Sequence, residues 1–237
     1  TGLTVTGLTY NAIDQLTNVS KTGLPTESYV YDDQGRRIQK TGSSTTYYLY
    51  NGPDIDAEYS AWTAPSTRYT HGPSTDDPIL RTTATTTQYY HQDGLGNVVA
   101  LTSATGSIDG TTRFDAWGNK LVSTGSIPQY GYTGREPDAT GLIYYRARYY
   151  DPSMGRFTQR DPKGMVDGVN PYTYVRNNPT NYTDPTGTQA FNNSLTNVSS
   201  FNTNYFGTST AGSGGGGYIS SGSQSLASVQ ANLISTP

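Results

Sequence analysis

A short pattern recurs along the chain: an aromatic residue, a polar residue directly after it, and a turn-forming residue at the fourth position after the aromatic one. The pattern begins at Tyr10, Tyr31, Tyr50 and Phe114, and its first three occurrences are 21 and 19 residues apart. A period of this length accommodates two short strands and a turn. The repeat therefore predicts β-hairpins that follow one another and extend a single antiparallel sheet.

Tyrosine has to supply much of the hydrophobic core of this chain. Leu, Ile, Val and Phe together number only 38 of the 237 residues, whereas Tyr alone numbers 21. Aromatic side chains pack well across the pleated surface of a sheet. No long segment shows the 3.6-residue spacing of apolar residues that is typical of helices. We therefore expect an all-β fold in which helix is scarce.

Two segments give more specific predictions of local structure. The strand-like run 45–50 leads into Asn51-Gly52, and both of these residues tolerate the positive φ of a type I′ hairpin turn. The run 144–150 alternates so that Tyr144, Arg146, Arg148 and Tyr150 share one face of an extended segment. Both faces of that segment are amphipathic.

Composition and charge argue against several classes of function. The chain has no Cys, which excludes a disulfide scaffold, a thiolate zinc site and a cysteine nucleophile. The net charge is −3 and the Lys and Arg residues are scattered, so there is no basic patch for a nucleic acid. No apolar run approaches the roughly 18 residues of a membrane-spanning helix. We therefore expect neither a nucleic-acid partner nor a membrane span.

The segment 188–237 differs in composition from the rest of the chain. It is rich in Ser, Asn, Thr and Gly, and none of its 50 residues is Asp, Glu, Lys, Arg or His. A catalytic toxin domain normally needs a general acid or base, which hydroxyl and amide groups supply poorly. This polar, uncharged tail is therefore expected to add strands to its own sheet or to a neighbour's, or to be the start of a truncated variable region.

Several segments resemble the Rhs/YD-repeat family: Tyr31-Asp32, 90–101, Phe114-Asp115, 130–136, 141–157, 161–164 and 184–187. The last four resemble the Rhs repeat-associated core domain of that family. The resemblance implies YD-repeat hairpins stacked into a spiralling sheet that forms a hollow shell, as in polymorphic toxins, toxin-complex cocoon subunits, wall-associated proteins and teneurins. It divides the chain into a YD-repeat region (1–129), the core domain (130–187) and the tail (188–237).

The resemblance also implies where the protein acts and what it assembles with. Members of the family are secreted or lie at the cell surface. Fewer than 190 matching residues cannot close a shell of the family's size, so the expected partners are an upstream shell region of the same protein or copies of this chain. Uncovered sheet edges would otherwise promote aggregation. We expect a structural role, in building or closing a proteinaceous shell.

Two Asp-Pro-x-Gly motifs begin at Asp161 and Asp184. Members of the family often cut their own chain just after the second motif, which here lies at Gly187 and Thr188; the family commonly has Leu where this chain has Thr188. The resemblance makes Asp161, Asp184 and Arg160 candidate catalytic residues. Two neighbouring carboxylates cannot both ionise cheaply, so one can act as an acid and the other as a base. Arg160 could stabilise the developing oxyanion.

The alternative for both motifs is an ordinary turn, in which the Asp side chain accepts hydrogen bonds from backbone N–H groups. If the chain is an enzyme at all, it is an aspartyl-type autoprotease that acts on itself and on no separate substrate. Three further functions stay open: an autoprotease, a subunit of a homopolymeric extracellular filament whose tail completes a neighbour's sheet, and a surface module that binds cell-surface glycans.

Other candidate sites are weak. Two imidazoles and no Cys do not make a usual zinc set, and the paired aspartates do not follow a calcium-loop pattern. We therefore expect no metal and no cofactor. Tryptophan could stack on a sugar ring, although cross-strand packing explains the aromatic residues better. The residues considered are His71, His91 and Asp93 for a transition metal, Asp54, Asp56, Asp76 and Asp77 for calcium, and Trp62 and Trp117 for sugars.

Overall fold

The computed structural model describes residues 5–61, 63–125 and 127–192. Within these residues the backbone forms antiparallel strands and two short 3-10 helices, Tyr132–Gly134 and Val175–Asn177, so the all-β prediction is confirmed. The predictions for residues 193–237 and for Trp62 lie outside the described residues. No helix within the described ranges is long and apolar enough to cross a membrane.

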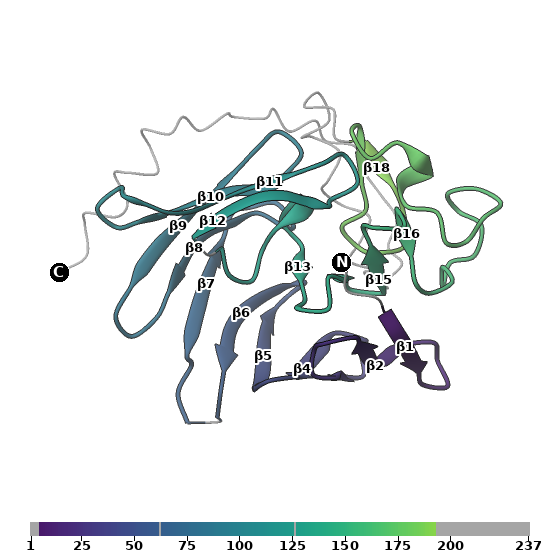
Figure 1. The fold of residues 1–237 in the computed structure, drawn as a ribbon, viewed down its shortest axis with the longest axis horizontal. Helices are drawn as coiled ribbons and strands as arrows, with labels where there is room; N and C mark the ends of the chain where they lie inside the picture. Colours follow the sequence, from purple (N-terminus) through teal and green to yellow (C-terminus); the bar gives the residue numbers. More distant parts are fainter. Residues whose placement is uncertain (1–4, 62, 126, 193–237) are drawn as a thin grey trace, which may run out of the picture. The chain divides into compact units, whose positions relative to one another are not determined.

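The largest sheet has twelve strands, and each strand pairs with the next one along the chain (Figure 1). This meander is what the repeat predicts, since each hairpin extends the same sheet. Its strands are β1 (Val5–Tyr10), β2 (Leu16–Lys21), β3 (Glu27–Tyr31), β4 (Arg37–Thr41), β5 (Thr45–Asn51), β6 (Asp54–Tyr59), β7 (Thr67–His71), β8 (Pro78–Thr82), β9 (Thr87–Gln92), β10 (Val98–Ser103), β11 (Ile108–Phe114) and β12 (Lys120–Gly125).

The polar residue that follows Tyr10, Tyr31 and Phe114 builds the turn, whereas Asn51, which follows Tyr50, belongs to a strand. The Asp32 carboxylate accepts the backbone N–H groups of Gln34 and Arg36 at 3.0 and 2.8 Å. Gly35 between them has φ +78°, a region that favours glycine. Asn11, Asp93 and Asp115 accept the amides two and four positions later in the same way. The aromatic-polar repeat therefore encodes one recurring turn.

The turn after β5 differs from the type I′ turn predicted at Asn51-Gly52. Asn51 belongs to β5 and pairs with Asp54, so the two turn residues are Gly52 and Pro53. A type I′ turn needs positive φ at both central positions, and the proline ring fixes φ near −65°. Only Gly52, at φ +61°, adopts the positive value. The prediction of a type I′ turn is therefore wrong.

A smaller sheet follows the meander and contains β13 (Glu136–Pro137), β14 (Ile143–Tyr145), β15 (Arg148–Asp151) and β16 (Arg156–Phe157). The run 144–150 is not one extended segment, because Tyr144 pairs with Tyr149 and Tyr145 pairs with Arg148 across a tight turn. Arg146 lies in that turn at φ +53°. A third sheet pairs β17 (Tyr182–Thr183) with β18 (Phe191–Asn192).

Tyrosine fills the core, as the composition predicts. One cluster joins Tyr145, Tyr150 and Tyr174 with Phe157, and the rings of Tyr150 and Tyr174 have centroids 4.3 Å apart. Most of these rings meet edge to face or tilted, an arrangement that aromatic quadrupoles favour. The phenol of Tyr150 donates to the Trp117 carbonyl, which attaches the small sheet to the loop between β11 and β12.

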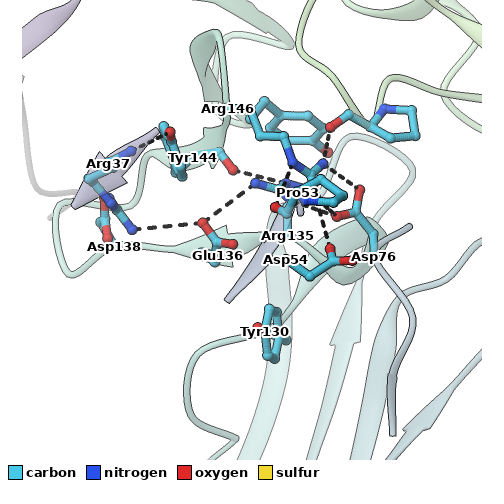
Figure 2. Close-up of polar contacts among 12 residues, drawn as sticks. Arg37, Pro53, Asp54, Asp76, Tyr130, Arg135, Glu136, Asp138, Tyr144 and Arg146 are labelled. Atoms are coloured by element: carbon cyan, nitrogen blue, oxygen red, sulfur yellow. Dashed lines mark hydrogen bonds and ion pairs between the residues drawn. The ribbon is translucent and has the colours of Figure 1, made fainter. Parts of the chain in front are cut away.

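One buried cation holds the meander and the small sheet together. Arg37, at the start of β4, is fully buried, and its Nη1 lies 2.5 Å from Asp138 Oδ2 (Figure 2). The ring centroids of Tyr29, Tyr48, Tyr144 and Tyr149 lie 4.5 to 5.9 Å from the guanidinium carbon. These rings come from both sheets, so Arg37 is surrounded only when the sheets are packed against each other.

We predict that Arg37→Met destabilises the protein by about 3–5 kcal/mol, because the buried Asp138 loses its guanidinium partner and keeps only its ion pair with Lys40. Urea unfolding followed by tyrosine fluorescence measures the change. Arg68→Met is the matched control: the ion pair of Arg68 with Asp56 is exposed to solvent, and its loss costs less than about 1 kcal/mol. Equal, small changes for the two variants would contradict the assignment of Arg37.

Candidate functional site

Both Asp-Pro-x-Gly motifs form turns, as the alternative interpretation requires. Asp161 Oδ1 accepts the Lys163 N–H at 2.8 Å, and the Asp161 carbonyl accepts the Gly164 N–H. The Asp184 carbonyl likewise accepts the N–H of Gly187 at 3.2 Å. Both aspartates are buried, which an isolated surface turn does not require. Because buried carboxylates are costly without partners, both side chains are expected to make further contacts inside the protein.

A single guanidinium brings the two carboxylates together. Arg148 Nη2 lies 3.0 Å from Asp161 Oδ2 and 3.3 Å from Asp184 Oδ2. The two oxygens are therefore no farther apart than the sum of these distances, although 22 residues separate the aspartates in sequence. Arg148 is itself almost fully buried, and its guanidinium carbon lies 3.6 Å from the centroid of the Phe157 ring.

The same groups contact the peptide bond between Gly187 and Thr188 from both ends. Arg148 Nε donates a hydrogen bond to the Gly187 carbonyl oxygen. The Thr188 N–H donates to Asp184 Oδ1 at 3.0 Å, and the Gln189 N–H donates to the same oxygen at 3.0 Å. A cation thus faces the carbonyl of this peptide bond, and a carboxyl group faces its nitrogen.

Glycine is required at position 187. Its φ is +70°, and an added Cβ would overlap the carbonyl oxygen of Tyr145. The close approach of these two backbones brings Gly187 next to β15, the strand that carries Arg148. The motif's final glycine therefore positions the peptide bond against the guanidinium.

Burial changes the acid–base behaviour of the site. It raises the pKa of Asp184 from 3.8 to about 6, against the opposing effects of the Gln189 amide and of Arg148. Burial also lowers the pKa of Arg148, an effect that Asp184 and Asp161 oppose. An arginine stays charged in proteins. At mildly acidic pH the site therefore holds one cation and an Asp184 that is partly protonated.

Arg160, the third candidate from the sequence, is exposed, and no ion pair of Arg160 with Asp161 or Asp184 is found among the described residues. Arg148, and not Arg160, is the arginine that contacts both carboxylates, and it was not among the residues predicted from the sequence. Its position in an aromatic run, whose residues are expected to be buried, could have identified it. A charged residue in such a run has to find a charged partner.

A second arginine positions the Asp184 turn. Arg146 donates hydrogen bonds to the Pro185 carbonyl and to Asp76, and it pairs with Asp54 at 3.0 Å (Figure 2). Asp76 also contacts Arg135 at 2.5 Å. Burial opposes ionisation, but Arg135 and Arg146 outweigh it and lower the pKa of Asp76. Ionised Asp76 thus holds Arg146 in place, and Arg146 in turn holds the backbone next to Asp184.

The remaining candidate residues have ordinary partners. His71 Nε2 lies 3.0 Å from the Ile55 carbonyl oxygen, and His91 Nε2 lies 2.9 Å from Thr102 Oγ1. Asp93 builds a turn, and Asp54 pairs with Arg146. Trp117 packs against Gly155. Within the described ranges, no three His, Asp or Glu side chains converge in a way that could hold a metal ion.

The sequence of this chain matches the model of a known protein family. The model of the teneurin YD-shell family matches residues 3–184, which include the whole meander, the first Asp-Pro-x-Gly motif and Asp184, the first residue of the second motif. The chain belongs to the teneurin YD-shell family. The resemblance to the Rhs/YD-repeat family is thereby confirmed, since shells of this type and their toxin relatives share the repeat.

Two relatives of this YD-shell chain are much longer proteins. It is 38% identical over 193 residues to the tRNA(Glu)-specific nuclease WapA of Bacillus subtilis subsp. natto, which covers 76% of this chain and 8% of that protein. It is 59% identical over 56 residues to toxin subunit YenC2 of Yersinia entomophaga, covering 24% of this chain and 6% of that one. The chain therefore spans less than a tenth of the length of either relative.

Solved structures show the same fold. The complex TcdB2-TccC3-Cdc42 matches 77% of this YD-shell chain and 10% of that chain, with 26% identity and a TM-score of 0.63. The complex TcdB2-TccC3 matches 76% and 10%, with 25% identity and a TM-score of 0.62. The described fold is thus similar to about a tenth of the chain in each of these solved structures.

We predict that Gly187→Ala destabilises the protein more than Gly164→Ala, the final glycine of the first motif. Gly164 has a comparable φ of +83° but open space around its Cα, so alanine there bears only the backbone penalty of about 1–2 kcal/mol. At Gly187 the overlap with Tyr145 adds about 1–3 kcal/mol. Thermal unfolding measures both, and equal losses would refute the close approach.

Proposed function

We propose that this chain is a shell-closing segment of a secreted YD-shell protein and that it cuts its own backbone between Gly187 and Thr188. One observation carries the cleavage: Arg148 contacts the carbonyl oxygen of this peptide bond while Asp184 contacts its nitrogen. An aspartyl-type hydrolysis needs a cation or donor at the oxygen, and a proton donor at the leaving nitrogen. Arg148 supplies the donor at the oxygen, and Asp184, whose Oδ1 accepts the Thr188 N–H in the uncut chain, is the carboxyl group placed to protonate that nitrogen as the bond breaks.

The proposed reaction is hydrolysis by a water molecule. Ionised Asp161 accepts a proton from the water as its oxygen bonds to the Gly187 carbonyl carbon. Arg148 stabilises the negative charge that develops on the carbonyl oxygen. Protonated Asp184 then gives its proton to the Thr188 nitrogen as the C–N bond breaks. The direct products are a carboxylic acid at Gly187 and an amino group at Thr188, with Asp161 protonated and Asp184 ionised. In water the new acid loses its proton and the amino group takes one up.

The shell role is supported by the sheet and by the relatives. The outer edges of β1 and β12 have no partner strand among the described residues, and β12 is exposed along its whole length. An exposed strand edge is a site for pairing with a further strand. Strands of a larger shell, from the same polypeptide or from another copy, would cover these edges, in keeping with relatives about ten times longer.

The place of action follows from the relatives as well. Those named as toxin subunits and the YD-shell family itself support a secreted or cell-surface protein. The name of WapA describes a tRNA nuclease, but this chain matches only 8% of that protein. We propose no nuclease activity here, because the proposed site acts on a peptide bond and its charged groups are buried.

We predict that the purified protein gives two fragments, which end at Gly187 and begin at Thr188, in denaturing mass spectrometry. Asp161→Asn and Arg148→Met should each leave one intact polypeptide of 25.5 kDa, because one loses the base and the other the cation at the oxygen. Asp151→Asn, at another Asp-Pro turn, is the matched control and should still be cut. Arg160, the cation expected from the sequence, does not contact the site, so Arg160→Met should also still be cut. An intact wild-type chain would overturn the proposal.

We predict that cleavage slows as pH rises above about 6. Burial raises the pKa of Asp184 from 3.8 to about 6, so the protonated form that donates to Thr188 is abundant below pH 6 and is lost above it. Each further pH unit should lower the rate about tenfold. Chain that is isolated unfolded and uncut from inclusion bodies, and then refolded into buffers from pH 5 to 8, gives this profile when the fragments are quantified over time. A rate that does not change across that range would exclude Asp184 as the acid.

A further inference from the structure

The second Asp-Pro-x-Gly motif holds its aspartate differently from the first. In the first motif, Asp161 Oδ1 accepts the backbone N–H of Lys163 at 2.8 Å. In the second motif the corresponding residue is Thr186, and its side-chain hydroxyl donates a hydrogen bond to Asp184 Oδ1 at 3.2 Å. A hydroxyl group therefore contacts the carboxyl group that the proposed reaction uses as its acid.

A second hydroxyl group holds the first one in position. Thr186 Oγ1 lies 2.9 Å from Thr188 Oγ1, which is hydrogen-bond distance, and the Thr188 backbone N–H donates to Asp184 Oδ1 at 3.0 Å. Thr188 is buried and Thr186 is half-buried. The contacts form a closed ring that includes Asp184 Oδ1, both hydroxyl groups and the Thr188 amide. The Thr186 hydroxyl is thus fixed beside the carboxyl group.

The charged groups around this carboxyl group act in both directions. Arg148 Nη2 lies 3.3 Å from Asp184 Oδ2, and this cation favours the ionised carboxylate. So does Arg146, which holds the backbone directly after Asp184. Negative charge on Asp161, which contacts the same nitrogen of Arg148, and on Asp167, which also acts on that arginine, favours the protonated form. A single further hydrogen bond can therefore change the balance between the two forms.

The Thr186 hydroxyl favours the ionised form of Asp184. The hydroxyl can also turn and accept a hydrogen bond from a protonated carboxyl group, but a bond between neutral groups is weaker than one to a carboxylate. Burial raises the pKa of Asp184 to about 6, and the Thr186 hydrogen bond is one of the contacts that oppose this rise. A hydrogen bond from the Thr188 hydroxyl polarises that of Thr186 and makes it a better donor.

We propose that the Thr186 hydroxyl, held by Thr188, restrains the self-cleavage by keeping Asp184 in its ionised form, which cannot donate a proton to the leaving nitrogen. This rests on the proposed function and deepens it, because it assigns a restraint to the same reaction. Thr186 is a positioning residue, since its hydroxyl acts on the acid and takes no part in breaking the bond. Loss of this hydroxyl should therefore speed cleavage above pH 6, whereas damage to the fold would slow it.

Thr186→Val removes the hydroxyl and fills a similar volume. Because a hydrogen bond to a charged acceptor exceeds one between neutral groups, we expect the midpoint of the cleavage pH profile to rise by about one pH unit. Cleavage at pH 8 should then be about tenfold faster than in the wild-type chain. Thr186→Ser retains the hydroxyl and should keep the wild-type profile, as should Thr180→Val, the matched control at an exposed turn. An unchanged midpoint for Thr186→Val, or slower cleavage at pH 8, would overturn the proposal.

Direct titration of Asp184 separates this proposal from the proposed cleavage. In the Asp161→Asn chain, which is expected to stay uncut, NMR follows the side-chain carboxyl carbon of Asp184 as pH changes, and Asp184→Asn identifies its signal. Adding Thr186→Val should raise the titration midpoint by about one pH unit. An unchanged or lower midpoint would contradict the restraint. If the wild-type chain is never cut but the midpoint rises, the proposed cleavage fails while the control of Asp184 by Thr186 stands.

Discussion

The packing of this protein depends on a guanidinium group buried among tyrosine rings. Arg37 makes its ion pair with Asp138 and contacts rings from both the meander and the small sheet. A buried charge without its partner is strongly destabilising, so β4 cannot hold Arg37 in a dry environment until the small sheet is in place. Asp138 is subject to the same constraint. The YD-repeat strands and the core segment are therefore expected to become stable together.

A series of charged contacts extends from Arg37 to the candidate site. Glu136 lies between Arg37 and Arg135, and Asp76 joins Arg135 to Arg146 (Figure 2). Arg146 holds the carbonyl of Pro185, the residue directly after Asp184. The turn that carries Asp184 is thus positioned by the same contacts that attach the core segment to the sheet. The geometry that the proposed cleavage requires is therefore complete only when that attachment is complete.

The sequence predicts local features well and distant partners poorly. The turns at Asp32 and Asp115 follow from short-range hydrogen bonds within the repeat, so they were predictable. The aspartates of the two motifs were paired through family resemblance, and the cation between them was not identified, because no spacing rule links Arg148 to residues 13 and 36 positions away. The tight turn at Arg146 was not predicted either. The partners that hold this residue at its positive φ are Asp54, Asp76 and the Pro185 carbonyl, and all three are distant from it in sequence.

The net charge of the buried site formed by Arg148 and its two aspartates bears on the hydrolysis proposed for it. With both carboxylates ionised, one guanidinium would leave a net negative charge in a region from which water is largely excluded, and such a charge is costly. A proton on one carboxylate makes the site neutral, and the raised pKa of Asp184 is consistent with the proton residing there. A protonated Asp184 thus reduces the charge of the buried site and is also the form that the proposed reaction requires as its acid.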